Sequence, residues 1–450
     1  MLAAAVALHA SAPAVAPLPE EVFPQLKDIL QTALKQSPTM LQRNIEVMQA
    51  EGTYLQNRSG MLPNLSGSVS YTENTSAPTE ATSVKSKSDG IFYSVSLNQP
   101  LFHWGTLKAQ SDAGKIGLLI AEKNYAEGYR TLALSLRAQY MALVVGKMAM
   151  RNAEFSLQVA EKALAIDEQR LKSGVIAPGD IIATRLAVND AMLARDRAQE
   201  AFLTAKNQIV RLAGIEAIDE SAIPDSVPRE AVNYVPDNGP KLLTSFRQGG
   251  VELTPAAESL ALSVKQADMN YKVQKYRLYP KLSLSASVSQ SNSTSATATY
   301  VSQVGVLTQM YSLNLSWNIF DGFATKGGKM SALASKRTYE RLLENHVAVA
   351  TEQARSLERQ VAFAYRAMDL ANVRRDLTAS AVNRAKQDIA IGVGSQNTID
   401  TLTASLNSYE LVAASARAEF LNRSAELMSL VGGDPMMAFV STRHYARAKQ

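Results

Sequence analysis

An internal duplication constrains the fold of this chain more than any other feature of its sequence. When Pro63 is aligned with Pro280, four flanking residues recur at the same offset. The matching pairs are Ala50 and Ala267, Tyr54 and Tyr271, Leu65 and Leu282, and Ser66 and Ser283. Longer segments match at offsets of about 217 to 220, namely YSVSLNQPLF with YSLNLSWNIF, KSGVIAPGD with GVGSQNTID, and VRLAGI with MSLVGG. Similarity that persists along the whole chain indicates two copies of one structural unit.

The duplication divides the chain into two repeats, residues 18–215 and 251–433. A linker with several prolines, residues 216–250, joins them and ends in a Gly-Gly pair, and residues 434–450 form a C-terminal tail. In each repeat we expect a β-hairpin followed by long helices. This prediction places the hairpins at 64–102 and 281–320, and the long helices within 105–213 and 322–431.

The predicted hairpins alternate apolar and polar residues with a period of two. In the first strand Leu65, Val69 and Tyr71 alternate with serines and a threonine, and the other strands follow a similar pattern. Such alternation predicts strands with one apolar and one polar face. It fits either an ordinary half-buried sheet or the wall of an outer-membrane barrel, where about nine to eleven tilted residues cross the lipid.

Three details favour the barrel wall. No charged residue occurs between Leu282 and Phe320, and the hairpin tips, residues 74–89 and 290–303, are long and rich in serine and threonine. Aromatic residues gather where the second strand of each hairpin ends, as in an interfacial girdle. These residues are Phe102, Trp104, Trp317 and Phe320. Because four strands cannot close a barrel and open edges are not tolerated in lipid, several chains would have to complete the ring.

The helices expected after the hairpins are unusually long. No proline occurs from Thr106 to Lys172 or from Thr325 to Val393, so each helix would run on the order of 100 Å at 1.5 Å per residue. Apolar residues recur at coiled-coil spacing along them. The stripes are Leu157, Leu164 and Leu171 in the first repeat, and Leu402, Leu406, Tyr409, Ala413, Ala416, Phe420 and Leu427 in the second. Such stripes predict packing between helices and carry no chemistry.

Composition and motifs argue against several classes of protein. The absence of cysteine excludes disulfides, thiolate metal sites, a cysteine nucleophile and a lipid-modified N-terminal cysteine. The four histidines lie far apart, and the 46 basic and 41 acidic residues are interleaved, which gives no pattern typical of nucleic-acid binding. No catalytic motif occurs. We therefore expect no enzyme activity, no catalytic residues, no cofactor, no metal site and no nucleic-acid partner.

The N-terminal segment, residues 1–17, is small and apolar and contains Ala-x-Ala steps. It resembles the core and cleavage region of a secretory signal peptide, although the positively charged start of such a signal is missing. A flexible Ala/Pro leader is the alternative.

Several motifs together resemble the TolC family of outer-membrane efflux proteins. They are PLFHWG (100–105) and NIFDG (318–322) after the strands, RLKSGVIAPGD (170–180) and VGSQNTID (393–400) at the far helical turns, and LKDILQTALKQSPTML (26–41) near the start. The similarity covers roughly residues 20 to 433. The resemblance implies a mainly α-helical chain with a membrane β-barrel. Three identical copies would form a twelve-stranded barrel in the lipid bilayer, continued by a long α-helical barrel, with the 216–250 linker as an equatorial belt.

The resemblance also implies a location and a function. The protein would lie in the outer membrane of a Gram-negative bacterium and extend into the periplasm. It would be the exit duct of a tripartite efflux or type I secretion system, working with a periplasmic adaptor (membrane fusion) protein and an inner-membrane transporter. Transport would be passive, through a trimeric tunnel gated at its periplasmic end, with the cargo chosen by the pump. The alternative is a structural or adhesive coiled-coil surface protein without channel activity.

In the family, the helical ends at the two far turns close the duct. By this resemblance Gly174 and Gly394 lie at turns that an adaptor would contact, and glycine suits such turns because it accepts a positive φ. Asp400 matches a pore-facing aspartate that would form an acidic ring in a trimer. Thr403 stands where the family has a second aspartate.

Asp180 matches a second gate aspartate of the family. Its arginine and tyrosine partners correspond here to Gln396 and Ile391, so the family's ionic lock is not expected in this chain. Asp180 and Asp400 each follow a turn, and either could instead be the N-cap of the next helix.

Overall fold

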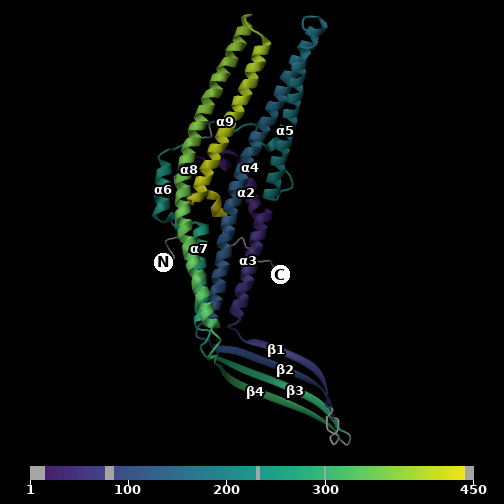
Figure 1. Ribbon diagram of the computed structural model, residues 1–450, viewed down its shortest axis with the longest axis vertical. Coiled ribbons are helices and arrows are strands. Elements are labelled where there is room, and N and C mark those ends of the chain that lie inside the picture. The colour runs from purple at the N-terminus through teal and green to yellow at the C-terminus, as the bar shows by residue number, and fades with distance from the viewer. Residues whose placement is uncertain (1–15, 77–85, 230–233, 298–299, 441–450) are drawn as a thin grey trace. The chain divides into compact units, whose positions relative to one another are not determined.

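The computed structural model describes residues 16–76, 86–229, 234–297 and 300–440 of the 450-residue chain (Figure 1). The predicted signal segment 1–17 is therefore described only for its last two residues, and the tail 434–450 only as far as residue 440. The outermost parts of both hairpin tips also lie outside the described residues.

Helices make up most of the described chain. They are α1 (Pro19–Val22), α2 (Pro24–Gln36), α3 (Pro38–Ser59), α4 (Thr106–Lys172), α5 (Ile181–Ala213), α6 (Asn238–Ser245), α7 (Pro255–Lys275), α8 (Ala324–Ala390) and α9 (Gln396–Leu430). Single turns of other helix types lie at Glu220–Ala222, Phe246–Gly250, Val251–Leu253 and Pro435–Phe439. The long helices α4 and α8 have 67 residues each, which corresponds to about 100 Å. Two helices of equal length at corresponding places are what the duplication predicts.

The chain forms two compact units. The helical unit comprises Met1–Ile45, Glu122–Glu258 and Glu344–Gln450, and the sheet unit comprises Glu46–Ala121 and Ser259–Leu343. Each unit takes parts of both repeats, so the units do not coincide with the repeats 18–215 and 251–433. The repeats are defined by similar sequences, whereas the compact units are defined by the segments that pack together in space.

The sheet unit contains one antiparallel sheet in the order β1-β2-β3-β4 (Figure 1). Its strands are β1 (Asn64–Ser76), β2 (Ser86–Phe102), β3 (Lys281–Thr297) and β4 (Tyr300–Ser316). The first hairpin thus has the predicted limits 64–102, while the second ends at Ser316, four residues before the predicted limit. The two hairpins join through β2 and β3, where for example Leu97 lies opposite Ala286.

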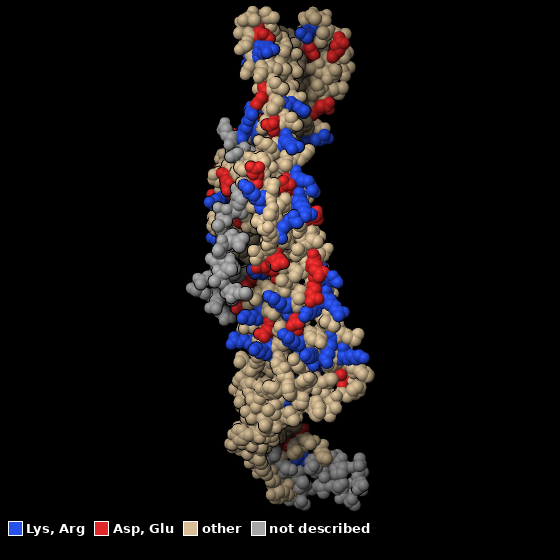
Figure 2. Space-filling model, turned by 90° about the vertical axis from the view of Figure 1, so that its left-hand side faces the viewer, with Lys and Arg blue, Asp and Glu red and all other residues tan. Residues whose placement is uncertain are grey.

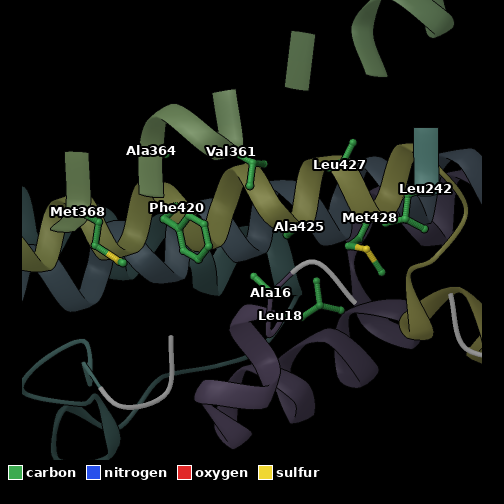
Figure 3. Close-up of a cluster of buried hydrophobic side chains, with 10 residues drawn as sticks. All are labelled: Ala16, Leu18, Leu242, Val361, Ala364, Met368, Phe420, Ala425, Leu427 and Met428. Atoms are coloured by element: carbon green, nitrogen blue, oxygen red, sulfur yellow. The ribbon is translucent and has the colours of Figure 1, made fainter. Parts of the chain in front are cut away.

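The core of the helical unit is an apolar cluster in which α8 and α9 pack together (Figure 3). Its buried members are Ala16, Leu18, Leu242, Val361, Ala364, Met368, Phe420, Ala425, Leu427 and Met428. The ring of Phe420 lies 5.7 Å from those of Tyr234 and Tyr365, so the linker, which contributes Tyr234, packs on both helices. Ala16, inside the predicted signal segment, belongs to this core.

The predicted apolar stripe of α9 is covered only in part. Ala413, Phe420 and Leu427 are completely buried, whereas Leu402 and Leu406 remain partly exposed. Within a single chain, most of the apolar side chains in the C-terminal half of the stripe are buried. Those in the half near the turn are only partly buried.

A buried charge cluster ties both ends of the described chain to α4. Arg137 is 1% exposed, and Glu20 and Asp434 are 6% and 5% exposed. The Arg137 guanidinium donates hydrogen bonds to both carboxylates, with Nε at 2.9 Å from Glu20 and Nη1 at 2.6 Å from Asp434. Burial disfavours the charged guanidinium, but the hydrogen bonds to Asp434 and Glu20 outweigh this effect and raise the pKa of Arg137. We call these three residues the Arg137 cluster.

The 216–250 linker is held against α4 and α8 by charged contacts. Lys147 donates to the carbonyl oxygens of Ile223 and Glu220 at 2.6 and 3.0 Å. On α8, Asp376 forms an ion pair with Arg229 at 2.7 Å. These contacts hold the described residues at the start of the linker against the two long helices.

None of the described helices combines the length and the apolar character needed to cross a membrane.

Candidate functional site

The two faces of the sheet differ in chemistry because the strand register brings like residues into the same rows. On one face, serines pair across strands, with hydroxyl oxygens 2.8 Å apart for Ser66 and Ser96 and for Ser285 and Ser312. On the other face, apolar residues form rows. One row contains Leu65, Leu97, Ala286 and Tyr311, and the next contains Gly67, Val95, Val288 and Gln309.

The apolar face of the sheet has no cover within the described chain. Leu65, Val69 and Tyr311 are 70%, 75% and 74% exposed, and Leu313 is 63% exposed. Contiguous exposed apolar residues are uncommon on soluble monomers and mark a surface that contacts protein or lipid. The few charged side chains visible on the sheet in Figure 2 agree with this character. The strand order also leaves β1 and β4 at the two edges, where they offer backbone hydrogen-bonding groups to further strands.

Aromatic side chains form a cluster where the strands meet the helices of the sheet unit. The indole nitrogens of Trp104 and Trp317 donate to the carbonyl oxygens of Pro280 and Leu278, at 2.7 and 3.1 Å. Both tryptophans thus bind the same connection between α7 and β3. The ring of Trp104 also lies 5.0 Å from that of Phe102.

Three aromatic residues near the strand ends were not predicted from the sequence. Tyr279 packs edge-on against Trp104 at 5.2 Å and against Tyr276 at 5.3 Å. Phe323 packs in the same way against Phe320 at 5.6 Å. Their position close to a strand end is the signal in the sequence that could have indicated them.

The far turns use a glycine at the same structural position in both repeats. Gly174 and Gly392 have φ values of +73° and +84°. Each lies two residues after its long helix, and the next residue donates back to a helix carbonyl: Val175 to Arg170 at 2.9 Å, and Val393 to Asp388 at 2.8 Å. This is the Schellman arrangement, in which glycine takes the left-handed position.

The expectation that Gly394 accepts a positive φ is wrong. The left-handed residue of the second turn is Gly392, and a Cβ on Gly394 would meet Ile389 Cγ1 at 3.1 Å. The sequence alignment matched Gly174 with Gly394 because it kept Asp180 in line with Asp400. The turn is shorter in the second repeat, so the glycine that follows the helix lies two residues earlier.

Substituting the two left-handed glycines should loosen the turns. We expect Gly174→Ala and Gly392→Ala each to destabilise its turn by about 1 kcal/mol, because an L residue with positive φ is strained. Limited proteolysis at the turns would then be faster. Gly179→Ala is the control, since Gly179 has no positive φ and no atom within 4 Å of the added Cβ. Equal cleavage of all three variants and the native protein would contradict the assignment.

The candidate gate residues make local contacts in this chain. The Asp180 carboxylate accepts a hydrogen bond from the Ala177 backbone at 2.9 Å and does not cap α5. Asp400 is half-buried in the second turn of α9 and accepts from Gln396 Nε2 at 2.9 Å. Ser395 is the N-cap of α9, since its side chain accepts from the Thr398 backbone. Asp180 thus occupies the N-cap position of α5 without a capping hydrogen bond from its side chain, whereas the capping alternative is wrong for Asp400, which lies inside α9.

Gln396 and Ile391 stand at the positions of the family's lock partners for Asp180. Within the described residues, no hydrogen bond or ion pair links Asp180 to Gln396 or Ile391. Thr403 lies half-buried one turn after Asp400. One nearby contact was missed: Thr184 Oγ1 donates to Asp167 at 2.7 Å and so ties α5 to α4 next to the turn. A hydrogen bond between neighbouring helices leaves no signal in the sequence.

The fold and these sites define a class of protein: a channel subunit with long helical hairpins and a small sheet whose apolar face is uncovered in the single chain. The chain belongs to the outer membrane efflux protein family, which it matches over residues 29–215 and 253–433. It is an exit duct for efflux in the outer membrane, and members of this family are passive channels rather than enzymes. None of the curated proteins compared with the chain matches it.

Solved structures share the fold at low sequence identity. The Campylobacter jejuni CmeC outer membrane channel is 15% identical, with a TM-score of 0.69, and the match covers 92% of this chain and 87% of that one. The outer membrane protein VceC of Vibrio cholerae is 15% identical, with a TM-score of 0.67 and coverages of 91% and 96%. The open state of the Neisseria gonorrhoeae MtrE outer membrane channel has the same identity and TM-score, with coverages of 91% and 89%.

Proposed function

We propose that three copies of the chain assemble into a closed duct. In each copy, β1 and β4 lie at the edges of the sheet, and pairing β4 of one copy with β1 of the next would close a twelve-stranded barrel. Closure would remove every open edge, which lipid requires. The apolar face would contact the acyl chains of the bilayer, and the serine face would line the lumen.

The observation that carries this proposal is the separation of the two faces in the half of the sheet next to the helices, from Leu65 and Leu97 to Ala286 and Tyr311. Apolar residues that are more than 60% exposed, such as Leu65, Tyr311 and Leu313, lie on one face, and paired serine hydroxyls lie on the other. A membrane barrel would explain both faces, because its outside contacts lipid and its inside is polar. The aromatic cluster around Trp104 and Trp317 would then lie at the periplasmic interface of the membrane.

The proposed duct extends into the periplasm of a Gram-negative bacterium and receives its cargo from other proteins. Family membership supports a periplasmic adaptor and an inner-membrane transporter as partners, in an efflux or type I secretion system. The turns that contain Gly174 and Gly394 are the proposed adaptor contacts.

Planar-bilayer recording of the purified protein tests the proposal directly. We expect a heat-modifiable trimer in the outer-membrane fraction and single-channel conductance after reconstitution. A soluble monomer that does not conduct would instead favour the coiled-coil surface protein considered above.

We further propose that Asp400 faces the lumen at the periplasmic constriction, where three copies form an acidic ring. Asp400→Ala should reduce cation selectivity and block by polyvalent cations, because the ring attracts cations. Reversal potentials in a salt gradient measure the selectivity. Asp190→Ala, which removes an exposed carboxylate from the first third of α5, is the charge-matched control. An unchanged reversal potential in Asp400→Ala would place Asp400 outside the constriction.

A further inference from the structure

Basic residues gather where the helices of the sheet unit meet the strands. They are Arg58, Lys108, Lys272, Lys275, Arg277, Lys281, Lys326 and Lys329, and we call them the basic collar. The four segments that contain them, residues 54–63, 103–111, 272–281 and 317–329, include one acidic residue, Asp321. The whole chain is nearly balanced, with 46 basic and 41 acidic residues. Figure 2 shows Lys and Arg side chains concentrated on the helices next to the sheet.

Most residues of the basic collar lie within a few residues of the helix ends that adjoin the strands. Arg58 and Lys275 lie in the last turns of α3 and α7, Lys108 and Lys326 lie in the first turns of α4 and α8, and Lys281 is the first residue of β3. One helical turn rises about 5.4 Å. The headgroup layer on each side of a bilayer is of similar thickness. If the sheet crosses the hydrocarbon, these side chains reach the phosphates of the periplasmic leaflet.

Within the described residues, the protein neutralises the collar only in part. The hydrogen bond from the Thr325 hydroxyl is the main cause of the lowered pKa of the Asp321 carboxyl, and Arg277 is close enough to that carboxylate to contribute. Lys272 pairs with Asp268 at 3.2 Å, and the other seven residues form no ion pair with the described part of the chain. Asp321, the acidic residue of these segments, accepts hydrogen bonds from the backbone and the hydroxyl of Thr325 at 2.8 and 2.6 Å. Its carboxylate thus caps the start of α8 instead of bridging to a lysine.

Helix electrostatics explain three of the eight collar residues. A positive charge is favourable at a helix C-terminus, which accounts for Arg58, Lys272 and Lys275. The same effect disfavours Lys108, Lys326 and Lys329, which lie near helix N-termini. A common external partner explains both groups. Two lysines also lie beside aromatic rings, with Lys275 Nζ 5.4 Å from the Tyr276 centroid and Lys326 Nζ 5.9 Å from that of Phe323. Alternation of aromatic and basic side chains is typical of a membrane interface.

We propose that the basic collar binds anionic phospholipid headgroups of the periplasmic leaflet and so fixes the depth of the sheet in the membrane. This inference rests on the proposed membrane position of the sheet. Each lysine or arginine close to an anionic surface strengthens binding on the order of fivefold, and salt weakens the effect. With eight basic residues in each chain, the preference for anionic over zwitterionic lipid should be large.

The test compares two triple variants as full-length, purified protein. Lys275→Gln/Arg277→Gln/Lys326→Gln removes three collar charges that have no ion pair in the described chain. Lys162→Gln/Lys172→Gln/Lys386→Gln removes three exposed charges near the far ends of α4 and α8 and is the control. Lipid retained after reconstitution into phosphatidylcholine vesicles with 20% or no phosphatidylglycerol is quantified by native mass spectrometry at low and high salt.

The native protein and the control variant should retain phosphatidylglycerol selectively at low salt. The collar variant should retain it with at least about fivefold lower preference. Equal retention of the two lipids by the native protein, or equal preference in the two variants, would overturn the inference. Competition by soluble glycerol phosphate as strong as that by vesicles would also overturn it, since the collar would then bind free phosphate. Channels that conduct but show no lipid preference would refute only the binding of anionic lipid by the basic collar. Failure to insert into either kind of vesicle would also refute the proposed membrane position of the sheet.

Discussion

Replacing Val95 with arginine should prevent the protein from assembling in the outer membrane. Val95 lies on the apolar face of β2, is 52% exposed, and occupies a row with Gly67, Val288 and Gln309 midway along that face. An arginine at the middle of the lipid-facing wall costs about 2–4 kcal/mol, and a trimer would contain it three times. Heat-modifiable trimer in the outer-membrane fraction, measured by gel electrophoresis, should be lost.

The neighbouring position supplies the matched control. Ser94 precedes Val95 in β2 but lies on the serine face, with its hydroxyl 2.9 Å from that of Ser68. Ser94→Arg should therefore still give trimer in the membrane fraction, with altered conductance, because its side chain points into the lumen. If Val95→Arg assembles as well as Ser94→Arg does, the apolar face does not contact lipid.

Arg137→Met should unfold the helical unit far more easily than any surface substitution. The change leaves Glu20 and Asp434 buried side by side without a positive charge between them. Loss of one partner from a buried ionic cluster costs about 3–5 kcal/mol. Urea unfolding of the purified protein, followed by circular dichroism, measures the loss.

Two further variants separate charge from packing. Arg130→Met lies on the same helix but breaks only a partly exposed pair with Glu127, so a loss below about 1 kcal/mol is expected. The triple variant Glu20→Gln/Arg137→Met/Asp434→Asn removes all three charges and should recover most of the stability lost in Arg137→Met. Equal stability of Arg137→Met and Arg130→Met would show that the cluster does not hold the chain ends.

The regular elements of this protein could be predicted because each has a local signal. Period-two alternation located the strand from Asn64, and the absence of proline located α4 and α8 to within a few residues. Both patterns depend only on residues that are close together in the sequence. The second hairpin was placed four residues too long because the apolar residues after Ser316 continue the alternation, while the backbone there leaves the sheet.

The contacts that hold the helical unit together could not be predicted in the same way. Arg137 meets Glu20 and Asp434, which are 117 and 297 residues away in sequence, and one sequence gives no sign of such a meeting. The error at Gly394 has a different cause. The turn between the helices differs in length between the two repeats, so similar residues in an alignment do not occupy the same position in the turn. The position of a left-handed glycine depends on where the preceding helix ends.

The pairing of β2 with β3 has a consequence for assembly. In the proposed ring there are six boundaries between hairpins, and duplication places three of them inside single chains, where β2 meets β3, and three between chains, where β4 meets β1. The inner boundaries can form during the folding of one polypeptide, independently of concentration. The outer boundaries require an encounter between molecules. Weakening the β2–β3 boundary would thus slow a first-order step of folding. Weakening the β4–β1 boundary would slow association, and a higher protein concentration would restore its rate.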